Sequence, residues 1–119
     1  MKPNGKRRKQ KPEWRAAVDD FVAAVKAEYG ERLKSVILFG SYARGDATRD
    51  SDVDVMVVLD RLGDYWTEAH RLWDLAYAAS AGAGRWDVLL SARIAAAEDY
   101  RIARLPLHRN VRREGKVLA

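Results

Sequence analysis

Two aspartates and a Gly-Ser pair are the residues of this chain whose types and spacing could do chemistry. Gly40 and Ser41 follow an apolar run, and Asp52 and Asp54 lie ten residues further on, at the start of a second apolar run. Side chains alternate along a strand, so the two aspartates are expected to face the same way. Neighbouring carboxylates repel each other, and a divalent cation bound through oxygen ligands would remove that repulsion.

The Gly-Ser pair has the character of a phosphate-binding turn. Gly40 leaves room for a ligand to approach the backbone. Ser41 is expected at the start of a short helix, where free N–H groups and the helix dipole favour an anion. A phosphate-binding turn beside a carboxylate pair indicates chemistry on a nucleoside triphosphate. The alternative is that Gly40 and Ser41 only form a turn and that the aspartates are surface residues at the start of a strand.

These residues resemble the signature of the polymerase-beta-type nucleotidyltransferases. The motif is most similar in sequence to that of the minimal nucleotidyltransferases (the MNT group) of that superfamily. It reads Gly40-Ser41-x-Ala43-Arg44-Gly45 with Ser51-Asp52-x-Asp54. The resemblance covers almost everything after residue 12 and is most specific in residues 36–59. It implies an α/β (α+β) fold, with a small mixed β-sheet and helices packed on one side.

The resemblance also implies a reaction, which is Mg²⁺-dependent transfer of AMP from ATP to a hydroxyl group with release of pyrophosphate. Asp52 and Asp54 would hold two Mg²⁺ ions, and Gly40 and Ser41 would bind the phosphates of ATP. Family members carry a third catalytic carboxylate on a following strand, and the resemblance places that metal-binding and catalytic role on Asp87.

Two of the candidate site residues have plainer alternatives. Arg44 could face a phosphate of the nucleotide, or it could simply pair with Asp46 or Asp50. Asp87 is unusual for a buried strand, because an unpaired interior carboxylate is unfavourable. It could instead be a residue of the strand edge, paired with Arg85 or Arg93.

Members of the MNT group typically pair with a HEPN-domain protein, usually an RNase toxin. Well-studied members act as antitoxins by AMPylation of a tyrosine on that partner, so the resemblance implies a HEPN partner here. One alternative is a catalytically inactive subunit that neutralises or scaffolds its partner. Another is a small-molecule nucleotidyltransferase, although the chain lacks the extra helical domain of the aminoglycoside enzymes.

The elements that must position the site can be read from periodicity and from capping residues. Two buried strands are predicted at residues 36–39 and 55–59, with one helical turn at 41–44 closed by Gly45. Asp64 is a suitable N-cap for a long helix that runs to about residue 81. The other predicted elements are helices at 13–29, 92–104 and 106–114 and a third strand at 86–90.

Composition limits the remaining possibilities. The 119 residues fit one domain and include no cysteine, which excludes a disulfide framework. No apolar run approaches membrane-spanning length, so a cytoplasmic protein without membrane contact is expected. Residues 1–12 contain six Lys or Arg residues and no acid. We expect a disordered basic tail there, with weak attraction to nucleic acid or a merely solubilising role, and a nucleotidyltransferase domain at 13–119.

The four tryptophans are more than one small core needs. Tryptophan is enriched at protein interfaces. Helical spacing places Trp14 in the core, whereas Trp66 and Trp86 are the better candidates for contact with a partner that carries the acceptor.

Overall fold

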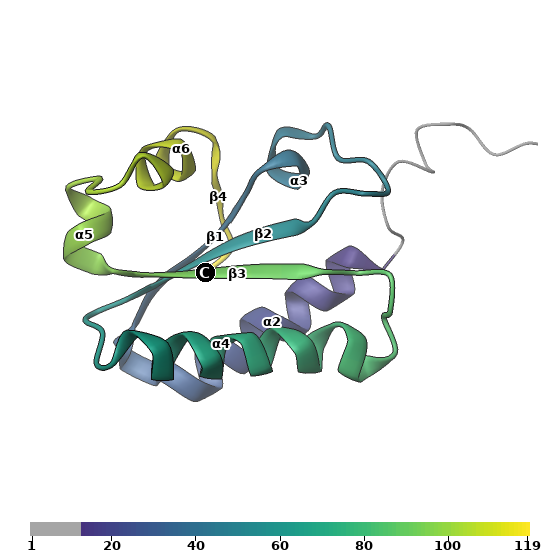
Figure 1. Ribbon diagram of the computed structural model, residues 1–119, viewed down its shortest axis with the longest axis horizontal. Coiled ribbons are helices and arrows are strands. Elements are labelled where there is room, and N and C mark those ends of the chain that lie inside the picture. The colour runs from purple at the N-terminus through teal and green to yellow at the C-terminus, as the bar shows by residue number, and fades with distance from the viewer. Residues whose placement is uncertain (1–12) are drawn as a thin grey trace, which may run out of the picture.

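The computed structural model describes residues 13–119, which form a four-stranded sheet in the order β3-β2-β1-β4 (Figure 1). The strands are β1 (Leu33–Phe39), β2 (Val53–Leu59), β3 (Leu90–Ala96) and β4 (Lys116–Val117). β1 is antiparallel to β2 and to β4, whereas β2 and β3 are parallel. The predicted α/β (α+β) fold with a small mixed sheet is therefore confirmed. The predicted basic tail lies outside the described residues.

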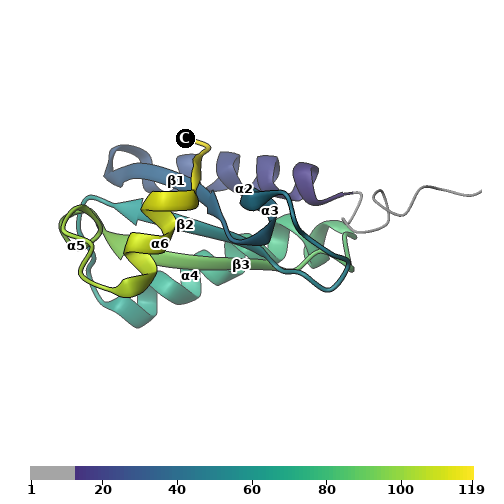
Figure 2. The same cartoon turned by 90° about the horizontal axis from the view of Figure 1, so that it is seen from above.

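Two long helices cover one face of the sheet (Figure 2). They are α2 (Trp14–Tyr29), which precedes β1, and α4 (Tyr65–Ala79), which makes the crossover between the parallel strands β2 and β3. Parallel neighbours need such a crossover because a tight turn can join only antiparallel strands. The larger hydrophobic core lies between these helices and the sheet and includes Phe21, Val55 and Leu72.

The opposite face of the sheet is only partly covered. It carries the one-turn helix α3 (Ser41–Arg44) and the short helices α5 (Ala97–Arg101) and α6 (Pro106–Glu114). A smaller core lies there, made by Ile37, Phe39, Met56, Val58, Ala95 and Val111. The prediction that helices pack on one side of the sheet therefore holds for the two long helices α2 and α4. The short helices α3, α5 and α6 lie over the other face.

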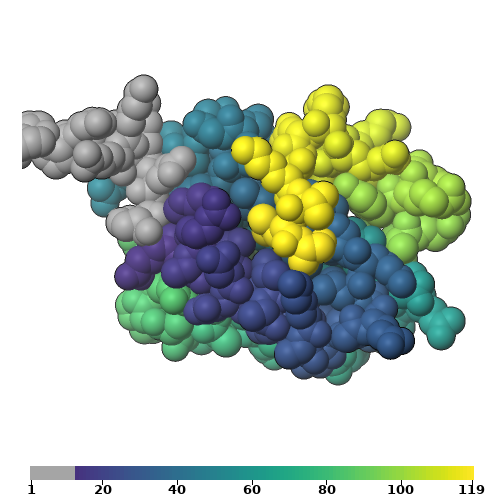
Figure 3. Space-filling view, turned by 180° about the vertical axis from the view of Figure 1, so that it is seen from behind, coloured from purple at the N-terminus to yellow at the C-terminus, as the bar shows by residue number. Residues whose placement is uncertain are grey.

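The C-terminal residues fasten the chain end to the first strand. The N–H of Leu118 donates to the carbonyl of Val36 at 2.7 Å, and the N–H of Val36 donates to the carbonyl of Ala119 at 3.0 Å. Figure 3 also shows the yellow C-terminal segment beside the purple N-terminal helix. None of the helices within residues 13–119 is both long and apolar enough to cross a membrane.

The predicted third strand and the helix after it are wrong in position. β3 begins at Leu90, near the end of the predicted strand 86–90, and continues to Ala96, where a helix over 92–104 was expected. Only Ala97–Arg101 of that range is α-helical. Every residue from Leu90 to Ala96 pairs with β2, so sheet pairing outweighs the helix propensity of the alanines.

The other local predictions agree with the structure. The helices at 41–44 and 106–114 have the predicted bounds. Gly45 adopts the left-handed conformation with φ of 85°. Asp64 caps α4, with its carboxylate accepting a hydrogen bond of 2.9 Å from the N–H of Thr67. These features depend on residues close in sequence, which is why the sequence predicts them.

Candidate active site

The turn after β1 brings the Gly-Ser pair against an aspartate. Gly40 lies between β1 and α3 with φ of 75° and ψ of −157°, a region that is essentially restricted to glycine. A Cβ atom at this position would overlap the carboxylate of Asp54. Only a residue without a side chain therefore allows Asp54 to lie directly against the turn.

The two aspartates lie together at the start of β2. Asp54 pairs with Phe39 across the β1–β2 ladder and is half-buried, whereas Asp52 is exposed just before the strand. Burial raises the pKa of the Asp54 carboxyl above its usual range, and the nearby negative charge of Asp52 raises this pKa further. The charges of Arg93 and Arg44 act in the opposite direction. The two carboxylates are thus close enough for the charge of Asp52 to act on Asp54.

Ser41 begins a closed backbone turn. The carbonyl of Gly40 accepts hydrogen bonds from the N–H groups of Ala43 and Arg44, at 3.1 and 3.0 Å. The carbonyl of Ser41 accepts from Gly45 at 2.9 Å and from the residue that follows it at 3.1 Å. Ser41 itself is partly exposed at this turn, directly after the glycine that lies against the Asp54 carboxylate. The expected strand–turn–helix context of the motif is therefore present.

Arg44 is engaged by carboxylates of the chain itself. Its guanidinium forms ion pairs with Asp46 at 3.3 Å and with Glu114 at 2.9 Å. The sequence suggested Asp46 as a partner, but Glu114 comes from α6, 70 residues away. Arg44 thus links the turn after Gly40 to α6 through its ion pair with Glu114. A phosphate would have to compete with the carboxylates of Asp46 and Glu114 for the Arg44 guanidinium.

The structure does not bring Asp87 to the other two aspartates. Asp87 is exposed in a turn before β3, and the residue of β3 that pairs with Asp54 is Ser91. Within residues 13–119 no group of three or more Asp, Glu, His or Cys residues could hold a metal ion. Asp87 also forms no ion pair with Arg85, which binds Asp20 at 2.8 Å. The reason is that β3 starts three residues beyond Asp87, so the strand carries other side chains to the site.

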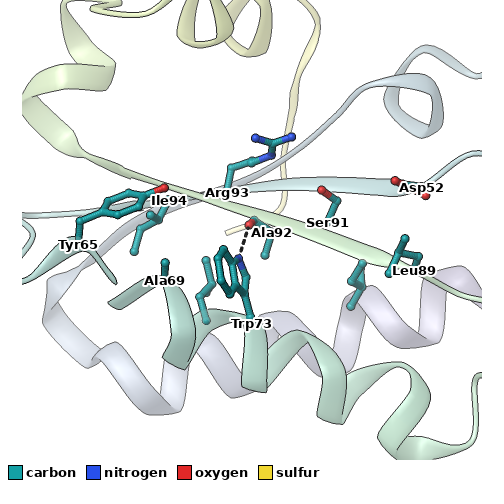
Figure 4. A pocket seen from close by; sticks show the side chains of 11 residues that line it. Asp52, Tyr65, Ala69, Trp73, Leu89, Ser91, Ala92, Arg93 and Ile94 are labelled. Atoms are coloured by element: carbon teal, nitrogen blue, oxygen red, sulfur yellow. Dashed lines mark hydrogen bonds between the residues drawn. The ribbon is translucent and has the colours of Figure 1, made fainter. Parts of the chain in front are cut away.

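Ser91 and Arg93 are the site residues that sequence reasoning missed. Figure 4 shows Arg93 on the side of β3 that faces away from Trp73 and α4, with Ser91 between Arg93 and Asp52. The sequence pattern that could have revealed them is a strand-like alternation. Leu90, Ala92 and Ile94 are buried, and the residues between them are more exposed. The helical interpretation of residues 92–104 concealed it.

A hollow of about 320 Å³ opens beside Asp52 along the free edge of β3. Its lining comes from α4, from β3 with the preceding Leu89, and from Asp52 itself (Figure 4). The indole N–H of Trp73 donates to the carbonyl of Ala92 at 3.4 Å, so α4 contacts the outer edge of the strand. The hollow is partly apolar through Tyr65 and Trp73 and charged through Asp52 and Arg93. It can therefore receive a group that approaches the aspartates from the side.

The donor set of the site fits a hard divalent cation. Mg²⁺ prefers carboxylate oxygens, often takes only one or two of them, and completes its shell with water and substrate phosphates. Asp52 and Asp54 provide this set. The pKa of Asp54 is raised first by burial and then by the negative charge of Asp52, which a cation would neutralise. The third carboxylate expected from Asp87 is not part of this pair among the described residues 13–119.

Comparison with known proteins agrees with this geometry. Residues 18–112 match the family model of the nucleotidyltransferase domain. A relative from Methanocaldococcus jannaschii, named "Putative protein adenylyltransferase MJ0604", is 38% identical over 103 residues. That match covers 86% of this chain and 94% of the relative.

Solved structures show the same fold. A crystal structure of a toxin–antitoxin with AMP-PNP matches with a TM-score of 0.51 and 28% identity, covering 85% of this chain and 72% of that one. A mutant of the toxin–antitoxin MntA–HpeT matches with a TM-score of 0.51 and 23% identity, over 85% and 71% of the two chains, and supports the fold alone. Because the family model spans most of the chain and the archaeal relative aligns over nearly its whole length, the chain belongs to the nucleotidyltransferase domain family and is of the minimal, MNT type.

Proposed function

We propose that this protein transfers AMP from ATP, with Mg²⁺, to a hydroxyl group on a partner protein. The observation that carries the proposal is the seating of the Asp54 carboxylate against the Gly40 turn, with Asp52 beside it. This arrangement supports a turn that binds the phosphates of a nucleotide and a carboxylate pair that binds its cation. The family supplies the reaction class, since it is a family of nucleotidyltransferases.

The proposed reaction is an in-line displacement at the α-phosphorus of ATP. A bond forms between the acceptor oxygen and the α-phosphorus, the bond from this phosphorus to the bridging oxygen breaks, and pyrophosphate leaves. The proton of the acceptor hydroxyl passes to water at the exposed side of Asp52. Ser41 and the turn after Gly40 would bind the leaving phosphates, and Asp52 and Asp54 would hold Mg²⁺. When bound, the ion supplies charge neutralisation at the phosphates.

The acceptor is a side chain of a separate protein, because the site is open. Asp52 is exposed, and the hollow beside it lies along a free strand edge. Trp66 and Trp86 are 62% and 75% exposed, far more than core residues, and aromatic residues of this kind are enriched at interfaces. The name of the archaeal relative, a protein adenylyltransferase, supports a protein acceptor.

The partner in this proposal is a HEPN-domain toxin, modified on a tyrosine, and the chain is its antitoxin. Support comes from the MNT-type motif and from the likeness to the toxin–antitoxin crystal structure with AMP-PNP, an ATP analogue. Modification of the toxin would silence it without the need for a permanent complex.

Intact-mass spectrometry of the co-expressed partner tests the proposal. With ATP and Mg²⁺ the partner should gain the mass of one AMP group, and Asp52→Asn combined with Asp54→Asn should abolish the gain. Asp19→Asn, at an exposed position of α2 away from the site, serves as the matched control and should leave the gain intact. An unmodified partner, together with transfer to a free small molecule, would instead support the small-molecule alternative.

A further inference from the structure

Arg93 lies on the same face of the sheet as the carboxylate pair. Its strand neighbours Ala92 and Ile94 belong to the core under α2 and α4, so Arg93 must point to the opposite face. In the parallel ladder Ser91 pairs with Asp54, and Arg93 pairs with Met56, two positions along. Met56 belongs to the smaller core on that opposite face. The register therefore carries a guanidinium to the site where sequence reasoning expected a third carboxylate.

The guanidinium of Arg93 is available to a ligand. The side chain is exposed and forms no ion pair with any residue in the described range 13–119, although its charge acts on Asp54. Arg44, by contrast, is already paired with Asp46 and Glu114. A planar guanidinium donates paired hydrogen bonds to phosphate oxygens, which makes arginine well suited to binding a phosphoryl group.

The strand order indicates which phosphate Arg93 would meet. The Gly40–Ser41 turn follows β1, the aspartates open β2, and Arg93 lies on β3, so the turn and Arg93 are on opposite sides of the aspartates. Attacking and leaving oxygens are roughly in line during phosphoryl transfer. With the leaving pyrophosphate at the Gly40–Ser41 turn, the transferred phosphate and the acceptor lie toward β3, at the hollow that Arg93 lines.

We propose that Arg93 binds the α-phosphate of ATP and neutralises the charge that develops there during transfer. The inference rests on the proposed nucleotidyl transfer and adds to it a cation supplied by the protein on the acceptor side. Fixed charges aimed at developing negative charge are among the strongest contributions to catalysis. Ser41 and Arg93 then bind different parts of one ATP molecule, so substituting each of them should change the affinities for ATP and for pyrophosphate differently.

Binding measurements separate the two roles without knowledge of the acceptor. We would measure the affinities of the full-length protein for ATP and for pyrophosphate, each with Mg²⁺, by isothermal titration calorimetry. Arg93→Gln removes the charge and keeps much of the stem, and should weaken ATP binding by roughly 10- to 150-fold, the range for one hydrogen bond to a charged group. Pyrophosphate affinity should not change. Ser41→Ala should weaken both ligands.

Two further variants control for charge and for geometry. Arg93→Lys keeps the charge but not the paired hydrogen bonds, and should recover part of the ATP affinity. Arg109→Ala removes an exposed arginine of α6 and should leave both affinities unchanged. Because Arg93 is exposed, the melting temperature of its variants should stay near that of the wild type.

Each contrary result has its own meaning. Wild-type ATP affinity in Arg93→Gln would overturn the inference and leave the proposed function standing. Equal loss of ATP and pyrophosphate would place Arg93 at the leaving phosphates and overturn its assignment to the α-phosphate. A wild-type protein that binds no ATP would refute the proposed function and the inference together.

Discussion

Replacing Gly40 with alanine tests the close fit between the turn after β1 and the Asp54 carboxylate. The substitution has two separate effects. The backbone at Gly40, with φ of 75° and ψ of −157°, disfavours any side chain by about 1–3 kcal/mol. The new Cβ also overlaps the Asp54 carboxylate, and such overpacking typically adds about 1–3 kcal/mol.

Gly30 offers a matched control for the backbone effect. It has φ of 54° and ψ of −127°, and a Cβ built there has no atom within 4 Å. Gly30→Ala should therefore show strain alone, whereas Gly40→Ala should show strain and overlap. We expect Gly40→Ala to lower the free energy of unfolding by about 1–3 kcal/mol more than Gly30→Ala. In a domain of this size, each kcal/mol lowers the melting temperature by roughly 4–8 °C.

A double-mutant cycle identifies the carboxylate as the cause. In an Asp54→Ala background the carboxylate is gone, and the remaining Cβ of residue 54 lies at an ordinary 3.4 Å from the Cβ built at position 40. The additional destabilisation by Gly40→Ala should then disappear in urea unfolding measured with chelator. Equal destabilisation by Gly40→Ala and Gly30→Ala, or an undiminished effect in the Asp54→Ala background, would refute this reasoning.

Three further predictions concern charge, capping and phosphate binding. Asp52→Asn should raise the melting temperature in chelator, because it removes repulsion on the order of 1–4 kcal/mol for charges about 4 Å apart. It should also abolish transfer, because it removes one of the two carboxylates proposed to hold Mg²⁺; scanning calorimetry and the mass assay check the two effects. Asp64→Ala should lower the melting temperature at pH 7, because the helix cap holds the pKa of Asp64 below its usual range. That contribution is present above the unfolded pKa near 4 and is lost as the pH falls through the lower folded pKa, so the difference between variant and wild type should vanish in acid. Ser41→Ala should weaken ATP binding in calorimetry more than Arg44→Ala does, because Arg44 is already held by two carboxylates of the chain.

The sequence by itself determined the central part of the site. Two apolar strands, a glycine between strand and helix, and two aspartates at alternating positions are all local features. Backbone preference and side-chain alternation act over a few residues, so they predicted α3, the left-handed Gly45 and the closeness of Asp52 to Asp54. For the same reason Pro106 and Gly115 marked the two ends of α6.

Only the tertiary structure decided which side chains complete the site. Residues 92–96 are alanine-rich and suit a helix as well as a strand, and their pairing with β2 settles the choice. That register places Ser91 and Arg93 at the aspartates and leaves Asp87 in a turn. The pair between Arg44 and Glu114 likewise joins residues 70 positions apart. Such contacts depend on how distant segments meet in the folded sheet, and no local pattern in the chain records that.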